Sequence, residues 1–76
     1  MANTHDWLRG SHWSRRTRCE VRPTGWGWQW RTVVGPILGR TLSDTGWALS
    51  RAGADAKATR AMVRLQREGW SDEAAP

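Results

Sequence analysis

The sequence has no phenylalanine, no tyrosine and a single cysteine among its 76 residues. The lone thiol of Cys19 excludes an intramolecular disulfide scaffold and indicates a reducing compartment. The longest nearly apolar run, residues 33–39, is far shorter than the roughly 18 residues that span a bilayer. The polar residues after Met1 do not resemble a signal peptide. We therefore expect a cytoplasmic protein without a membrane partner, in the host cytoplasm if a phage encodes it.

Groups that hold metals or perform catalysis are equally sparse. The one conceivable metal set is His5, Asp6, His12 and Cys19. Zinc ligands normally occur as tight pairs, whereas these histidines and the cysteine are spaced seven residues apart. A nucleophile pair of Cys19 and His12 lacks a third group to orient the base. The sequence also contains no glycine-rich phosphate loop and no paired carboxylates, so we expect no metal, no cofactor and no enzymatic activity.

Tryptophan and arginine are abundant instead. The chain has seven tryptophans and a net charge of +5. Residues 1–31 hold six arginines against two acidic side chains, whereas residues 32–76 hold six basic side chains against five acidic ones. A basic half accelerates association with phosphate or any other acidic surface. The heavy use of Trp, Arg, Ala and Gly indicates a GC-rich coding sequence, as in actinobacteria and their phages.

A tryptophan ladder predicts the central strand, residues 26–34 with the sequence WGWQWRTVV. A period of two places Trp26, Trp28 and Trp30 on one face of an extended strand, a conformation that aromatic and β-branched residues favour. These rings form a stacking platform for bases, a protein-docking patch or the core of the domain. Because the glycine, glutamine and arginine on the other face cannot form a core, we expect the tryptophan face to pack on the rest of the domain.

Turn-forming residues divide the neighbouring sequence into short strands. Residues 19–22 form a candidate strand that ends at a Pro-Thr-Gly turn. Gly35–Pro36 predicts a second turn, followed by a third strand at Ile37–Leu42. We expect a loop at 43–46, and either a fourth short strand or the approach to a helix at 47–49. The short links make a three-stranded antiparallel meander the simplest topology.

A helix is predicted over Arg51–Glu68, where good helix formers are frequent. Ser50 is placed to cap its N-terminus and Gly69 its C-terminus. One face collects small and apolar side chains at helical spacing, namely Ala54, Ala58, Ala61, Met62 and Leu65. The expected fold is α+β: a three-stranded antiparallel β-meander with one C-terminal α-helix packed across it.

We divide the chain into three parts. Residues 1–16 lack a sustained period and are expected to form a flexible basic N-terminal arm. Residues 17–70 form the single ββ(β)α domain, and residues 71–76 form an acidic C-terminal tail. If the tryptophan ladder packs on the helix, Trp47 and Trp70 at the two helix ends are the better candidates for exposed rings.

Two basic clusters are candidates for binding phosphate. Arg15, Arg16 and Arg18 belong to the arm region beside Trp13, and basic arms are known to reach along nucleic-acid grooves. A solvated tail is the alternative interpretation. The second cluster is a helix stripe that either follows a phosphate backbone or forms an ordinary solvated face. Its members are Lys57, Arg60, Arg64 and Arg67.

In element order, residues 18–68 resemble the three-stranded-sheet-plus-helix DNA-binding domains of the AP2-like and integrase arm-binding type. The shared features are a W-x-W sequence followed by arginine, a hairpin and an Ala-rich helix. In that family, Arg and Trp side chains on the exposed sheet face contact the major-groove bases and the backbone. The resemblance implies such contacts at Arg22, Trp28, Trp30, Arg31 and Arg40.

Two classes of function remain. One is a nucleic-acid-binding accessory or regulatory protein of phage or plasmid origin. The other is a phage-type host-takeover protein that inhibits a host protein by binding its acidic surface through Trp and Arg anchors. An exposed three-tryptophan face favours binding through aromatics, whereas an exposed Gln/Arg face favours phosphate. A free sheet edge would also allow a homodimer. Candidate binding residues are Arg15, Arg16, Arg18, Arg22, Gln29, Arg31, Arg40, Lys57, Arg60, Arg64 and Arg67, and candidate aromatic anchors are Trp13, Trp28, Trp30, Trp47 and Trp70.

Overall fold

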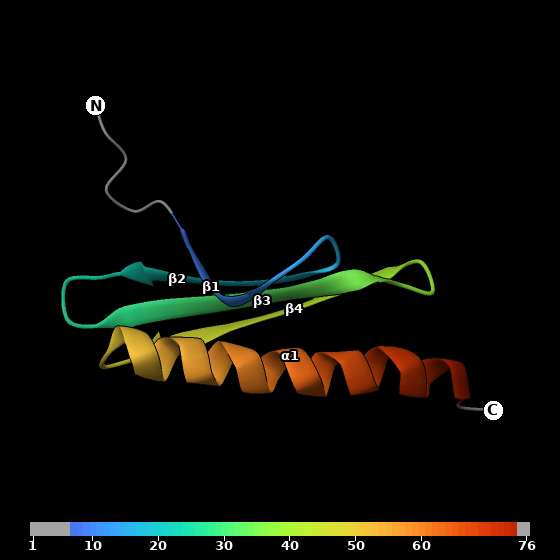
Figure 1. The fold of residues 1–76 in the computed structure, drawn as a ribbon. Coiled ribbons are helices and arrows are strands. Elements are labelled where there is room, and N and C mark those ends of the chain that lie inside the picture. Colours follow the sequence, from blue (N-terminus) through green and yellow to red (C-terminus); the bar gives the residue numbers. More distant parts are fainter. Residues whose placement is uncertain (1–6, 75–76) are drawn as a thin grey trace.

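Figure 1 shows one β-sheet with one helix packed against it. The computed structural model describes residues 7–74. Its elements are β1 (Leu8–Trp13), β2 (Thr17–Pro23), β3 (Trp28–Ile37), β4 (Arg40–Ala48) and α1 (Arg51–Ala74). The strands lie in the order β1-β2-β3-β4, and every neighbouring pair is antiparallel. The α+β class, the antiparallel meander and the C-terminal helix are confirmed, with four strands where three were predicted.

The additional strand, β1, belongs to the segment that was predicted to be a flexible arm. It pairs with β2, and its register shifts between Arg9 and Trp13. The carboxylate of Asp55 on α1 accepts hydrogen bonds from the amide of Ser11, at 2.9 Å, and from the Ser11 hydroxyl. Residues 8–13 are therefore a strand of the sheet, so the prediction of a free arm is wrong for them, and residues 1–6 lie outside the described part. The strand was not predicted because the register shift interrupts the period of two that would have indicated it.

Strands β3 and β4 run through two segments that were predicted to be a turn and a loop. Gly35–Pro36 lies inside β3, where the register with β4 shifts. Proline is compatible with a sheet at such irregularities, because one ladder hydrogen bond is already missing there. The chain reverses instead at Leu38 and Gly39, which have positive φ angles of 54° and 80°, as in a two-residue hairpin turn. Residues 43–46 pair with β3 as part of β4.

The core lies between the inner face of the sheet and the small-sided face of α1. The buried residues of β2 and β3 include Cys19, Val21, Trp30, Thr32, Val34 and Ile37. Opposite them, the helix buries Ala54, Ala58, Ala61 and Leu65, in agreement with the predicted helix face. Thr32 is fully buried and donates a hydrogen bond from Oγ1 to the carbonyl oxygen of Ala58, at 2.8 Å. A side chain of the sheet reaches the helix backbone in this way because alanine allows close approach.

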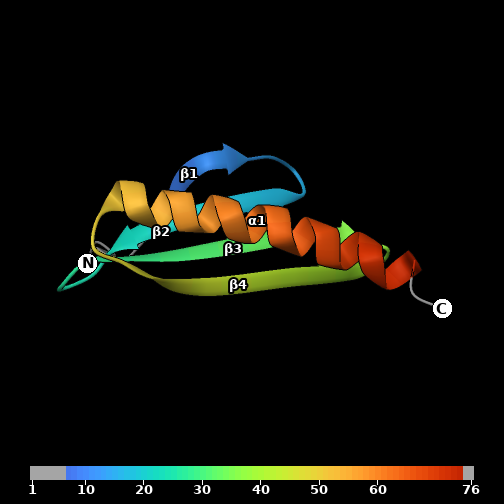
Figure 2. The same cartoon turned by 90° about the horizontal axis from the view of Figure 1, so that it is seen from below.

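Helix α1 begins where predicted but extends further. Ser50 Oγ accepts a hydrogen bond from the amide of Gly53 at 3.0 Å, which is an N-cap contact. Gly69 is not a C-cap, because the helix continues to Ala74 through most of the predicted acidic tail. A Cβ atom at Gly69 would lie 2.9 Å from Cδ1 of Ile37. Glycine therefore allows α1 to pack closely on the sheet, which it crosses obliquely in Figure 2.

Candidate nucleic-acid interface

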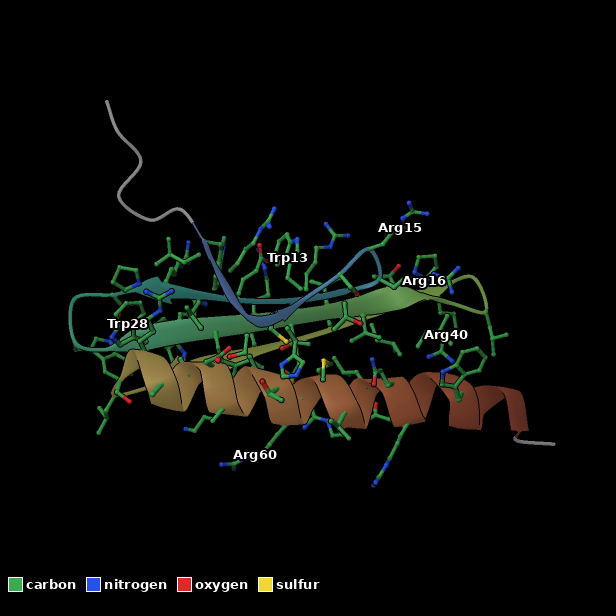
Figure 3. The ribbon with its side chains drawn as sticks, viewed as in Figure 1. Trp13, Arg15, Arg16, Trp28, Arg40 and Arg60 are labelled. Carbon is green, nitrogen blue, oxygen red and sulfur yellow. The ribbon has the colours of Figure 1, made fainter. Side chains whose placement is uncertain are left out.

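The sheet face opposite α1, called the outer face below, is exposed and basic (Figure 3). Residues paired directly across antiparallel strands share a face, so the positions that alternate with the buried core residues define it. Its members are Arg9 and Trp13 of β1, Arg18, Glu20 and Arg22 of β2, Gln29, Arg31 and Val33 of β3, and Ser43, Thr45 and Trp47 of β4. The outer face thus combines four arginines with one carboxylate, that of Glu20.

Polar contacts and one indole ring hold the two central arginines of the outer face in fixed orientations. Glu20 Oε1 accepts hydrogen bonds from Nε and Nη2 of Arg31, at 2.9 and 2.7 Å. Nε of Arg22 donates to Oε1 of Gln29 at 2.8 Å. The ring of Trp7, just before β1, has its centroid 4.5 Å from the Arg22 guanidinium and 4.3 Å from that of Arg31. Cation–π contacts of this kind contribute about 0.5–1 kcal/mol each at exposed sites.

A pair of tryptophan rings stands at one end of the outer face. The β2–β3 turn is closed by the amide of Thr24, which donates to the carbonyl of Gly27 at 2.8 Å. A Cβ atom on Gly27 would lie 2.5 Å from the carbonyl oxygen of Ala48, so glycine lets this turn lie against the end of β4. Trp26 of the turn therefore sits beside Trp47 of β4, with ring centroids 5.3 Å apart. The two residues are 62% and 47% exposed, so both rings present surface to solvent.

The opposite corner of the outer face carries a third ring and further positive charge. The Arg9 guanidinium lies 4.8 Å from the ring centroid of Trp13. Figure 3 shows Trp13 and Arg15 on the side of the sheet away from α1. Arg16 and Arg40 lie at the same end of the sheet, near the β1–β2 and β3–β4 turns. Of the predicted arginines at this end, Arg18 belongs to the outer face, whereas Arg16 lines a groove beside α1 and Arg40 pairs with the buried Ile37.

The predicted helix stripe lies in the other layer of the protein. It consists of Lys57, Arg60, Arg64 and Arg67 on α1. Arg60 points away from the sheet in Figure 3. Arg64 forms an ion pair with Asp44, and Nζ of Lys57 donates to the carbonyl oxygen of Trp47 at 3.0 Å. The stripe and the outer face are therefore separate surfaces, and two of the four stripe residues make structural contacts.

The tryptophan ladder is divided between core and surface. Trp30 is only 8% exposed, and its Nε1 is buried without a hydrogen-bond partner in the described part of the chain. Trp28 is half-buried and packs against the same core cluster. The prediction that the ladder packs on the helix is confirmed for these two residues, so the placement of Trp30 as an aromatic anchor is wrong. Trp26 is exposed because β3 begins only after it, and Trp70 on α1 is exposed as predicted.

The sequence did not indicate three residues on or beside the outer face: Arg9 on it, and Trp7 and the exposed ring of Trp26 at its margin. The register shift in β1 lies between Arg9 and Trp13, so local alternation does not reveal that these two residues share a face. Trp26 continues the ladder pattern even though it lies in a turn. The pattern alone could not separate it from its buried neighbours.

Cys19 and His12 make separate contacts in the structure. Cys19 is buried, and this burial raises the pKa of its thiol above the ordinary value, which disfavours the nucleophilic thiolate. His12 Nδ1 lies 3.3 Å from Oγ1 of Thr59. Among the side chains that the structure describes, those of residues 7–70, no three of His, Cys, Asp or Glu are grouped as metal ligands. The other two members of the predicted set, His5 and Asp6, lie outside the described residues.

The described part of the chain contains no helix with the length and apolarity needed to cross a membrane. Comparison of the chain with protein-family models, curated proteins and solved structures found no match. The function is therefore argued from the geometry and charge of the outer face, because a fold does not by itself define a function.

Proposed function

We propose that this protein binds nucleic acid through the outer face of its sheet, as an accessory or regulatory protein of phage or plasmid origin. The proposal is based mainly on one observation. Helix α1 covers the apolar face of the sheet, and the opposite face carries Gln29 and four arginines, two exposed and two half-buried, against a single carboxylate. An exposed face of this composition suits phosphate groups, because arginine presents several donors in a planar fork.

Contacts to phosphate supply most of the affinity in this proposal. Arg18 of β2 is exposed opposite Trp13, and Arg15 is exposed in the turn between β1 and β2. Each phosphate neutralised on duplex DNA contributes about 0.9 to the slope of log K against log salt. About four such contacts would lower the affinity roughly 150-fold between 50 and 200 mM salt.

A salt titration of charge-matched variants tests the proposal. Dissociation constants of the wild-type protein for duplex DNA, single-stranded DNA and RNA are measured between about 25 and 250 mM salt. The variant Arg15→Ala/Arg18→Ala removes two charges from the outer face and its turn, and Arg60→Ala/Arg67→Ala removes two from α1. We expect the first variant to reduce the duplex salt slope by about 1.8 and the second to leave it nearly unchanged. Equal effects of both variants, or no binding at low salt, would contradict the proposal.

A groove between the C-terminal half of α1 and strands β2 and β3 favours the second candidate function, docking on an acidic host protein. The groove has a volume of about 730 Å³ and is lined by Arg16, Thr17, Val34, Ile37, Val63, Gln66, Arg67 and Trp70. Its rim combines the exposed ring of Trp70 with two arginines, the combination that dominates protein-binding hot spots. This candidate predicts that Trp70→Ala abolishes capture of one host protein while Arg18→Ala does not.

A further inference from the structure

We infer that the outer face prefers single-stranded nucleic acid, with an unpaired base stacking on the Trp26–Trp47 pair. This inference rests on the proposed function and specifies its ligand. The rings are exposed in spite of their size, and Trp47 lies in the same cross-strand row as Gln29 and Arg22. Exposed aromatic rings next to a basic track are the two parts that sequence-tolerant single-strand binding requires.

The backbone of Trp47 is fixed by the sheet and by Lys57, and its ring is packed against Trp26. Register pairing sets Trp47 opposite Gln29, which in turn pairs with Arg22. The backbone carbonyl of Trp47 accepts a hydrogen bond from Nζ of Lys57. The indole ring of Trp47 contacts that of Trp26, with the ring centroids 5.3 Å apart. A ring that is already oriented loses little side-chain entropy when a base stacks on it.

The basic track connects this platform to a second ring. Trp47 lies in the cross-strand row of Arg22. Trp13 lies in the row of Arg18, which precedes Arg22 by four residues in β2. Four residues of strand and three strand spacings place Trp13 and Trp47 on the order of 20 Å apart across the sheet. Arg18 and Arg31 lie between them, Arg31 is paired with Glu20, and the ring of Trp7 lies against Arg22 and Arg31. A single strand that follows this diagonal meets one ring at each end and positive charge in between.

Duplex DNA cannot use the same rings. Its base faces are stacked inside the helix, so a flat sheet reaches only the phosphates and the groove edges. The arginines therefore serve both forms, whereas the tryptophans contribute only when bases are unpaired. A stacked base is sensitive to replacement of its aromatic partner, and removal of the Trp47 ring should weaken single-strand binding about tenfold.

The test compares Trp47→Leu with Trp70→Leu, because both residues are exposed tryptophans on different surfaces. Leucine keeps an apolar side chain at each position, and Trp47→Phe keeps an aromatic ring. Dissociation constants are measured for a twelve-residue thymine DNA strand, the equivalent uracil RNA strand and a DNA duplex, with thermal unfolding as the check on folding. We expect Trp47→Leu to weaken single-strand binding about tenfold and duplex binding less than twofold. Trp47→Phe should restore most of the single-strand affinity, and Trp70→Leu should change neither.

The outcomes separate this inference from the proposed function. If both forms bind with steep salt dependence and Trp47→Leu changes neither, the stacking inference is wrong and the proposed function stands. An equal loss for single strand and duplex also overturns the inference, because the ring would then act through the fold or the charge of the face. Absence of binding to all three probes at low salt overturns both. The strand with the larger Trp47-dependent loss identifies DNA or RNA as the ligand.

Discussion

Gly10 decides whether residues 8–13 are a strand packed on the domain or a free arm. A Cβ atom at this position would lie 2.5 Å from Oδ1 of Asp55 and 2.9 Å from the carbonyl oxygen of Cys19. The second neighbour is backbone of β2 and cannot swing away. Gly10→Ala must therefore push β1 from β2 and disturb the hydrogen bond between Asp55 and the Ser11 amide. Overpacking of this kind costs about 1–3 kcal/mol.

The expected net effect is somewhat smaller than this steric cost. Replacing glycine by alanine also reduces the entropy of the unfolded chain, which stabilises the folded state by about 0.4–1 kcal/mol. Gly10 does not have a positive φ angle, so backbone strain adds nothing. We expect a net loss of about 1–2 kcal/mol and a fall in Tm of about 4–16 °C.

Gly25→Ala is the matched control, because a Cβ atom there meets nothing within 4 Å. It should leave the stability unchanged or raise it slightly, by the same unfolded-state effect. Urea unfolding followed by tryptophan fluorescence gives both free energies of unfolding. Equal stabilities of the two variants would show that β1 does not pack on β2 in solution and would refute the account of the N-terminal segment.

Three further predictions concern a thiol, a carboxylate and the length of the ligand. The buried Cys19 thiol, whose pKa burial raises, should react slowly with a thiol reagent in the folded protein and much faster in urea; rapid reaction without denaturant would contradict its place in the core. The hydrogen bond from Arg64 lowers the pKa of Asp44, so this pair stabilises the protein above the ordinary carboxyl pKa and ceases to do so as the pH falls through the lowered value. Wild type should therefore be more stable than Asp44→Asn at pH 7, and this difference in unfolding free energy should become smaller below about pH 4. A difference that becomes larger below pH 4 would refute the assignment. Single-strand affinity should rise with length until one strand reaches both rings and then flatten; dinucleotides that bind equally tightly would exclude the two-ring path.

The parts of the fold that follow a regular period could be predicted from the sequence. Helix spacing identified Ala54, Ala58 and Leu65 as the buried face of α1, and alternation identified Trp28 and Trp30 as inward-facing. Both predictions succeed because a regular element repeats its buried side at a fixed interval.

Irregular segments could not be predicted, for physical reasons that differ from one segment to the next. Gly35–Pro36 is typical of a turn, yet it lies in β3, and the reversal occurs at Leu38, whose positive φ angle is uncommon for leucine. Residues 43–46 are polar because β4 is an edge strand and one side of it faces solvent. Gly69 marks a close helix–sheet approach instead of a helix end, and only tertiary contacts distinguish these two roles of glycine.

The candidate site was partly predictable. Gln29 and Arg31 were assigned to the face opposite the tryptophans because they alternate with them, and Arg22 was assigned to the same face by the family resemblance. The structure places all three on the outer face, half-buried. The addition of Arg9 and of the Trp26–Trp47 pair depended on contacts between distant parts of the chain. Register and turn geometry create these contacts, and neither can be inferred from local composition.

The most direct test of the outer face as the binding surface is a residue-by-residue NMR map of isotopically labelled protein during titration with a single-stranded oligonucleotide at low salt. We expect the largest shifts on the backbone amides of Arg18 in β2 and Arg31 in β3 and on the indole N–H groups of Trp13 and Trp47. The indole N–H of Trp70 and the amides around Arg60 on α1 should remain unchanged. Shifts concentrated on α1, or no shifts at any oligonucleotide concentration, would contradict the central claim.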